Sequence, residues 1–365
     1  MTFGGIPYNE TSITRYEELK ASGVTYALSS FPNMQALQRT LKIAHKAGIK
    51  MIVNCPELKT DTKHTIKMLK NKPAIAGYFI QDEPNSRKFN SLAEQVKKIQ
   101  SIDDTHFCYI NLFPNYADTL QLGAKTYKGY VHKFITEVPV KHLSFDNYPV
   151  VGDSLRQKWY KNLEIFSKET QKAGKPFWGF ALTVSHGPYP IPTVAMLKLE
   201  VFSDLAYGAQ GIQYFYYWTH KDPVWNYHQG PITLGGKRST VYDRMKEVNQ
   251  QIKDLSWIFL GARVISVAHT GDTIPQGTRR LTVLPKPIKK LTTEGEGAVV
   301  SVLKNGKMSF LVIVNRDFRH MMKLTINCDS TVSKILKDGS MVPASVYSPA
   351  MEIDPGDVAI YGWND

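Results

Sequence analysis

Apolar residues occur in short runs along the first two thirds of the chain, and each run is followed by a polar loop and then by an amphipathic stretch. The runs are mostly continuous and rich in β-branched and aromatic residues, which is typical of strands buried on both faces. We therefore expect eight short strands that alternate with helices. The predicted strands are Phe3–Tyr8, Val24–Leu28, Lys50–Asn54, Ile75–Ile80, His106–Ile110, His142–Phe145, Pro176–Leu182 and Gly211–Tyr217.

The stretches between these runs carry helical signals. Met34–Ala47 repeats apolar residues three and four positions apart, and Pro192–Tyr207 begins with a proline, which suits the first turn of a helix. Gly48 and Gly174 lie just before strands, where a helix should end. Eight strands that alternate with helices pair in parallel and can close into a (β/α)8 barrel. An open, doubly wound sheet is the alternative, but the count of eight and the lack of a Gly-rich turn after the first strand favour the barrel.

The pattern changes after Leu260, where runs of strand composition follow one another without helices between them. Asn305-Gly306 separates two of these runs and is a strong hairpin signal, so we expect Val299–Leu303 to pair with Met308–Val314. The runs are Arg263–Ala268, Arg280–Leu284, Ala298–Lys304, Lys307–Asn315, Met322–Cys328, Lys334–Leu336 and Asp357–Gly362. The predicted fold is a (β/α)8 barrel over residues 1–257, followed by an antiparallel β-sandwich domain over residues 258–365.

Three carboxylates follow predicted strands at the end where a (β/α)8 barrel carries its active site. Asp82 and Glu83 end the fourth run, and Asp146 follows the sixth. We expect these residues to be catalytic, although only one of two adjacent strand residues points to the axis unless the strand turns. The structural interpretation is that Asp82 or Glu83 caps the next helix, a role that Asn85 could fill instead, and that Asp146 fixes a turn.

Polar and aromatic residues near the same strand ends are candidates for substrate contact. Trp218 closes an aromatic run and would suit a platform for a sugar ring, because an aromatic face packs on the apolar C–H face of a sugar. The structural alternative is that these residues pack at the rim of the barrel, belong to its core or lie in solvated loops. The predicted binding residues are Tyr8, Asn111, Tyr148, His186, Tyr216 and Trp218.

Motifs for cofactors and metals are missing from the sequence. HExxH, Walker A, GxGxxG and GxSxG patterns do not occur, and the histidines show no metal-ligand spacing. The three cysteines, Cys55, Cys108 and Cys328, are far apart and odd in number, so we expect buried free thiols. We expect neither a cofactor nor a metal.

Three segments of the chain resemble clan A glycoside hydrolases. Tyr78–Asn85, with Asp82-Glu83-Pro84, is similar to the strand-four signature of that clan, whose Asn-Glu-Pro carries the acid/base glutamate. Ser144–Pro149 and Ala206–Trp218 are similar to the strand-six and strand-eight segments of family 42 β-galactosidases. The resemblance covers the barrel and implies a hydrolase of O-glycosidic bonds with Glu83 as the proton donor and an oligosaccharide or polysaccharide as the substrate.

The chain departs from this clan in two places. Asp82 replaces the usual Asn, and the strand-seven segment Trp178–Val184 has no carboxylate where the clan places its nucleophile. A catalytic pair of Glu83 and Asp146 would explain this, with a carboxyl separation of about 5–5.5 Å for retention or roughly 6.5–9.5 Å for inversion. In a second explanation the Asp82-Glu83 pair resembles the arrangement in hexosaminidases that use the acetamido group of the substrate as the nucleophile. This resemblance implies that Glu83 is the acid, that Asp82 orients the acetamide and that Tyr148 or Tyr216 assists. In a third, the barrel binds glycans without cleaving them.

Composition and charge change this picture little. The 365 residues, 42% hydrophobic and 21% charged, are typical of a globular protein and exclude a disordered or fibrous one. The net charge of +13 is spread over predicted helices, with one compact basic patch, Lys286–Lys290, in a predicted loop. We expect no nucleic-acid partner and no membrane span.

The first residues lack the features of a signal peptide, and a periplasmic or secreted location stays open because a signal could have been removed. The sequence does not indicate an oligomeric state.

Overall fold

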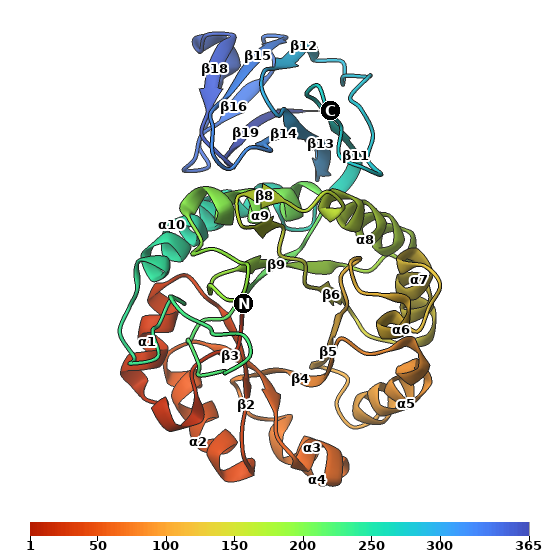
Figure 1. Cartoon of the computed structure of the whole chain (residues 1–365), viewed down its shortest axis with the longest axis vertical. Coiled ribbons are helices and arrows are strands. Elements are labelled where there is room, and N and C mark those ends of the chain that lie inside the picture. The colour runs from red at the N-terminus through yellow and green to blue at the C-terminus, as the bar shows by residue number, and fades with distance from the viewer. Residues whose placement is uncertain (365) are drawn as a thin grey trace. The chain divides into compact units, whose positions relative to one another are not determined.

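A closed barrel of eight parallel strands forms the centre of the N-terminal part of the chain. The computed structural model describes residues 1–364. The strands follow one another around the barrel in the order β1-β10-β9-β6-β5-β4-β3-β2. Their bounds are β1 Thr2–Phe3, β2 Tyr26–Ser30, β3 Lys50–Asn54, β4 Ile75–Asp82, β5 Phe107–Leu112, β6 Leu143–Phe145, β9 Phe177–Leu182 and β10 Gly211–Phe215. Each corresponds to one predicted apolar run, so the predicted barrel is confirmed (Figure 1).

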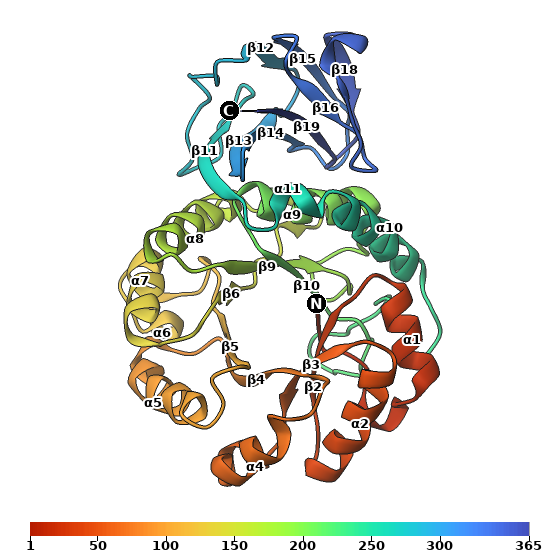
Figure 2. The same cartoon turned by 180° about the vertical axis from the view of Figure 1, so that it is seen from behind.

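Helices separate most of the barrel strands, and α1, α2, α4, α5 and α7 lie outside the ring in both views (Figures 1 and 2). Side chains start several of them, as where the Asn33 oxygen accepts a hydrogen bond from the Ala36 backbone N–H at 2.9 Å. The bounds are α1 Ile13–Ala21, α2 Met34–Lys46, α3 Glu57–Thr60, α4 Thr62–Leu69, α5 Phe89–Gln100, α6 Thr119–Leu122, α7 Tyr127–Glu137, α8 Trp159–Ala173, α9 Val194–Ala206, α10 Thr240–Asp254 and α11 Ser256–Phe259. Short elements are the 3-10 helices Tyr8–Glu10, Ser86–Lys88 and Ala344–Val346, and the hairpin of β7 Val150–Val151 with β8 Ser154–Leu155.

The first barrel strand is shorter than the predicted run Phe3–Tyr8. β1 ends at Phe3 because Gly4 adopts a φ of +64°, which takes the backbone out of the extended conformation. Tyr8 consequently lies in a 3-10 helix and does not end a strand.

Two antiparallel sheets form the C-terminal part of the chain. The larger has the order β11-β13-β14-β19-β16-β17 and the smaller the order β12-β15-β18. One hydrophobic core, which includes Val300, Leu311, Leu324 and Ile353, is shared by strands of both sheets, so the predicted sandwich is confirmed. The bounds are β11 Arg263–His269, β12 Ile288–Thr293, β13 Ala298–Asn305, β14 Met308–Asn315, β15 Met322–Cys328, β16 Ser333–Ile335, β17 Met341–Pro343, β18 Ala350–Ile353 and β19 Val358–Asn364.

The predicted hairpin is present, with Val299 opposite Val314 and Leu303 opposite Phe310. Two other predictions for this region were wrong. Arg280–Leu284 contributes only an isolated bridge at Arg280, and the prolines that follow have no N–H to extend a ladder. The basic patch 286–290, predicted as a loop, runs into the edge strand β12, because exposed edge strands tolerate lysines.

The chain forms two compact units. The first comprises residues 1–147, 168–191 and 211–246 and contains all eight barrel strands. The second comprises residues 148–167 and 192–210 together with the chain from residue 247 onward. The single boundary predicted at residue 257 therefore stays a prediction. Within residues 1–364, no helix combines the length and apolar character needed to cross a membrane.

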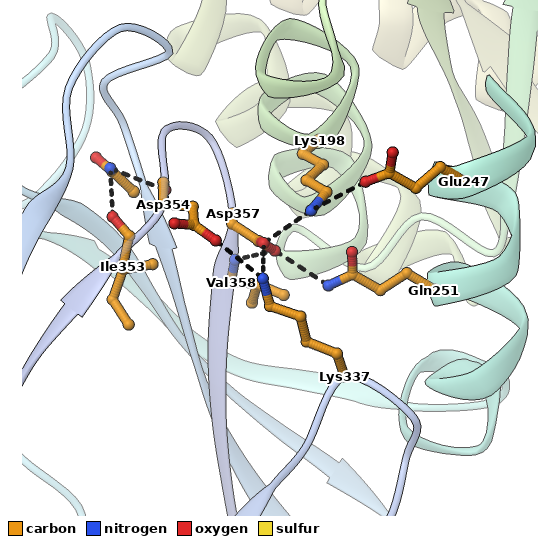
Figure 3. Close-up of polar contacts among 9 residues, drawn as sticks. Lys198, Glu247, Gln251, Lys337, Ile353, Asp354, Asp357 and Val358 are labelled. Carbon is orange, nitrogen blue, oxygen red and sulfur yellow. Dashed lines mark hydrogen bonds and ion pairs between the residues drawn. The ribbon is translucent and has the colours of Figure 1, made fainter. Parts of the chain in front are cut away.

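A buried carboxylate organises polar contacts inside the second unit (Figure 3). Asp357, which precedes β19 and is 1% exposed, accepts hydrogen bonds from Lys198 of α9 at 2.9 Å and from Lys337 at 2.6 Å. Its other oxygen accepts from Gln251 of α10 at 3.0 Å and from the Val358 backbone N–H at 2.8 Å. Burial opposes ionisation of Asp357, but the hydrogen bonds from Lys337 and Lys198 outweigh it and lower the pKa of the carboxyl.

We expect Asp357→Asn to destabilise the protein by about 3–5 kcal/mol, because the buried Lys198 ammonium loses its 2.9 Å ionised partner and keeps only the 3.8 Å contact with the exposed Glu247. Asp354→Asn is the matched control, since Asp354 also pairs with Lys337 but is largely exposed, and it should cost less than about 1 kcal/mol. Urea unfolding followed by circular dichroism measures both. The difference in the free energy of unfolding between wild type and Asp357→Asn should shrink as the pH falls through the lowered pKa of Asp357. An equal loss of stability in Asp357→Asn and Asp354→Asn would contradict the role assigned to Asp357.

Candidate active site

The end of β4 brings two adjacent carboxylates to the same end of the barrel. Asp82 pairs in register with Asn111 of β5, and the Glu83 backbone N–H donates to the Asn111 carbonyl at 2.9 Å. A register shift between Phe79 and Gln81 and a φ of +40° at Glu83 take the chain out of regular strand geometry. A left-handed φ is strained for glutamate, and such strain concentrates at functional sites.

Contacts made by the following residues hold this strained turn. The Tyr130 hydroxyl of α7 donates to the Pro84 carbonyl at 2.8 Å. The Asn85 side chain caps the next 3-10 helix by accepting from the Arg87 N–H at 3.0 Å. Since Asn85 provides the cap, Asp82 and Glu83 are not needed for it, and the structural interpretation of these two carboxylates loses its support.

One amide links the carboxylates of strands four and six. Asn111, which is 2% exposed, donates from Nδ2 to Asp82 Oδ1 at 3.1 Å and to Asp146 Oδ1 at 2.7 Å. The Glu83 and Asp146 carboxyls are hydrogen-bonded to each other. The structure thus brings together the three predicted catalytic residues and Asn111, which was predicted only as a binding residue.

The environment favours the protonated forms of these carboxyls. Burial and the negative charge of Asp82 raise the pKa of Glu83 to about 7, although the hydrogen bond with Asp146 lowers it. Burial, followed by the charges of Glu83 and Asp82, raises the pKa of Asp146 well above its usual value. Asp82 is open to solvent at the mouth of the barrel, but the protein around it still removes enough water to raise its pKa. A proton is therefore available on this cluster near neutral pH.

A chain of buried side chains below the carboxylates sets the orientation of the Asn111 amide. The Ser144 hydroxyl of β6 donates to Asn111 Oδ1 at 2.8 Å and accepts from Gln213 Nε2 of β10 at 2.7 Å. Tyr109 of β5 donates to Gln213 Oε1 at 2.5 Å. Because Asn111 Oδ1 accepts from Ser144, the amide hydrogens point toward Asp82 and Asp146. No specific sequence signal marks Tyr109, Ser144 or Gln213, since such polar residues lie singly within apolar strands.

A pocket of about 510 Å³ adjoins Asp82, within the roughly 300–1,000 Å³ range of small-molecule sites. Its walls are mostly aromatic and apolar, with Tyr216 as one wall and Asp82 as the carboxylate of the lining. The lining residues are Phe3–Pro7, Leu28–Ser30, Phe79, Asp82, Tyr216, Trp218 and His220. Tyr216 packs tightly on Gly4, where a Cβ would lie 1.5 Å from the ring. The pocket therefore has a fixed aromatic wall next to an acidic group.

Aromatic side chains from the loop after β10 extend this wall. The ring centroids of Tyr216 and His220 are 4.7 Å apart, and those of Tyr216 and Tyr227 are 5.6 Å apart. Trp218 lines the pocket but is only 6% exposed, and the Arg15 guanidinium lies 5.1 Å from its ring centroid. Tyr216 and Tyr227 are more accessible than Trp218, so the platform predicted at Trp218 stays a prediction.

Other predicted binding residues lie apart from the pocket lining. Tyr8 is 51% exposed. His186 is 5% exposed, packs on Tyr189 at 4.7 Å between ring centroids and contacts the Val184 carbonyl through Nδ1 at 3.1 Å, so it is not a solvated loop histidine. Burial lowers the pKa of His186, which makes it neutral near pH 7. Tyr148 is buried in the second unit, and its carbonyl accepts a hydrogen bond from Arg156 at 3.2 Å.

Two further strand ends carry residues with structural contacts. Thr183, directly after β9, is buried and donates to the Tyr216 carbonyl at 2.8 Å. Glu57, after β3, accepts from the Met34 N–H at 2.9 Å and so holds the start of α2. Neither position provides a carboxylate that joins the Asp82, Glu83 and Asp146 cluster.

Metal-binding geometry is not found within residues 1–364, where no three His, Cys, Asp or Glu side chains are arranged to hold an ion. Cys55 and Cys108 are buried free thiols, and Cys328 is a partly exposed one. Burial raises the pKa of Cys55 to about 11 and that of Cys108 to about 12, which disfavours the reactive thiolate.

Solved structures share this fold, whereas the sequence matches no protein-family model and no curated protein. A GH42 β-galactosidase from G. stearothermophilus aligns over 100% of this chain and 98% of its own, with a TM-score of 0.62 and 9% identity. A glycoside hydrolase family 5 protein from Bacteroides vulgatus aligns over 100% of this chain and 88% of its own, with a TM-score of 0.61 and 10% identity. The chain therefore shares the barrel fold of these glycoside hydrolases.

A third neighbour is the β-galactosidase from the psychrophilic Marinomonas ef1, with a TM-score of 0.52 and 11% identity. The alignment covers 70% of this chain and 60% of that one, so the chain spans only part of that enzyme. At these identities the likeness shows the fold, and the chemistry has to be argued from the side chains of the site.

We expect Asn111→Ala to raise the pKa values of Asp82 and Asp146, because the Asn111 amide donates to both and stabilises their ionised forms. NMR titration of ¹³C-labelled aspartate carboxyls measures the shift. Asn54→Ala is the matched control, since Asn54 ends the neighbouring strand β3 but donates to the Ser30 hydroxyl. Unchanged titration of both aspartates in Asn111→Ala would contradict the bridging role.

Proposed function

We propose that this protein is a glycoside hydrolase in which Glu83 is the general acid. The observation that carries the proposal is the Glu83 carboxyl, with a pKa of about 7, at the carboxyl end of β4 and next in the chain to Asp82, which lines an aromatic pocket. Protonation of a glycosidic oxygen needs a carboxylic acid that keeps its proton near neutral pH. The aromatic walls suit the C–H faces of a sugar, and Asp82 suits its hydroxyl or amide hydrogens. The substrate is an oligosaccharide or a polysaccharide.

The partner carboxylates have different roles in this proposal. Asp146 interacts directly with Glu83, and a hydrogen bond between the two side chains lowers the pKa of Glu83. We therefore assign Asp146 to positioning Glu83 and sharing its proton. Asp82, which lines the pocket, is the carboxylate that faces the substrate.

A glycan-binding protein without catalysis is the second candidate function. It is favoured by Thr183 at the end of strand seven, where clan A enzymes carry their nucleophile. The two candidates differ in turnover, because the pocket would bind a sugar in either case.

We expect Glu83→Gln to lower kcat by about 10²–10⁴-fold, the usual contribution of a general acid, and to leave sugar binding intact. The measurement is release of reducing ends from a glycan panel, with binding followed by calorimetry. The loss should be smaller for 4-nitrophenyl glycosides, whose leaving group needs little protonation. Glu10→Gln is the control, because exposed Glu10 carries the same charge near the first strand end and lies outside the pocket lining. Binding without turnover by the wild type would establish the non-catalytic alternative.

The activity should fall as the pH rises through about 7, because Glu83 then loses the proton that it donates. The alkaline limb of the kcat/KM profile measures the pKa of the group in the free enzyme. Asn111→Ala should move this limb, since the Asn111 amide stabilises the ionised carboxylates around Glu83. A profile that stays flat up to pH 9 would exclude Glu83 as the acid.

A further inference from the structure

The carboxylate cluster provides an acid but no group placed to attack the anomeric carbon from the other side. Asp146 is in contact with Glu83 and so is on the same side of any bound sugar as the acid. The Thr183 hydroxyl is buried and donates to the Tyr216 carbonyl. A glycosidase of this geometry needs a nucleophile from another source, and one recognised source is the substrate itself.

The pocket beside Asp82 has the three kinds of group that an acetamido substituent needs. The Asp82 carboxylate can accept the amide N–H, and the side chains of Phe3 and Phe79, with ring centroids 5.9 Å apart, offer apolar surface for the methyl group. Tyr216 lines the same pocket and can donate its hydroxyl to the amide carbonyl oxygen. Asp82 and Tyr216 are close enough that the Asp82 charge, after burial, contributes to raising the pKa of the tyrosine to about 12.

The pocket also has the size that such a substrate needs. The pocket volume of about 510 Å³ leaves room for a pyranose ring together with its substituent.

We propose that the substrates are 2-acetamido-2-deoxyhexosides and that the acetamido carbonyl oxygen of the substrate is the nucleophile, with Asp82 accepting the amide N–H and Tyr216 orienting the carbonyl. This inference rests on the proposed function of Glu83 as the acid. It also explains why strand seven lacks a carboxylate. The attacking amide and the leaving group must be trans, so glucosamine- and galactosamine-type substrates are cleaved as β-anomers.

The bonds and protons balance in two steps. In the first, the carbonyl oxygen bonds to C1, the bond from C1 to the leaving oxygen breaks, and that oxygen takes the proton of Glu83. The product is an oxazolinium ion, whose N–H is held by Asp82. In the second, water attacks C1, Glu83 takes a proton from the water, and the bond between C1 and the acyl oxygen breaks. The acetamido group is restored, and one water molecule is consumed for each bond cleaved.

The experiment compares matched 4-nitrophenyl β-glycosides that carry a 2-acetamido, a 2-trifluoroacetamido or a 2-hydroxyl group, in both gluco and galacto configurations. Fluorine withdraws electrons from the carbonyl oxygen, so kcat/KM should fall by about tenfold or more, or about 1.4 kcal/mol, from acetamide to trifluoroacetamide. The 2-hydroxyl glycosides should be cleaved far more slowly than the acetamides. Asp82→Asn should reduce turnover of the acetamido substrates, and Glu10→Gln should not.

The outcomes separate this inference from the proposed function. Cleavage of 2-hydroxyl glycosides as fast as acetamides, with dependence on Glu83, would overturn the acetamido mechanism and leave the glycosidase. Equal rates for acetamide and trifluoroacetamide would also overturn it. Absence of turnover on every glycoside tested would overturn both.

Discussion

The site depends on one amide group that has only two hydrogens to give. Asn111 donates both of them, to Asp82 and to Asp146, and Glu83 shares a hydrogen bond with Asp146. Three carboxyl groups at a partly desolvated end of the barrel cannot all ionise without large electrostatic repulsion, so the cluster keeps a proton. The retained proton is the one that a general acid at this site would donate. Its presence follows from crowding and desolvation, and the lysine-rich composition of the chain plays no part in it.

The orientation of that amide is determined inside the barrel. Tyr109, Ser144 and Gln213 come from strands β5, β6 and β10 and form the hydrogen-bond chain that fixes Asn111. Polar residues at these interior positions cost packing and desolvation energy, which the complete set of hydrogen bonds offsets. The interior of this barrel is therefore part of the site and not only its support.

Sequence patterns predict the fold well because strand and helix periods are local properties. All eight barrel strands and the Asn305-Gly306 hairpin follow from short-range signals, and the rule for strand ends gave Asp82, Glu83 and Asp146. The sequence predictions that were wrong have causes far away in the chain. Pairing with β15 makes a strand of the basic segment, and the first strand ends at Gly4, which has a φ of +64° and packs against Tyr216. The bridging role of Asn111 and the relay below it depend on distances between strands, which no single segment of sequence contains.

The contact between Gly4 and Tyr216 joins the two ends of the barrel sequence. Gly4 follows the first strand and Tyr216 follows the last, and the β1–β10 pair closes the ring. Strands four to six can gather the three carboxylates without that closure, but the pocket wall next to Asp82 forms only when the first and last strands meet. A barrel in which the first and last strands have not paired would therefore have the carboxylate cluster but no pocket for a substrate. Catalysis would then be limited to chains that have finished folding.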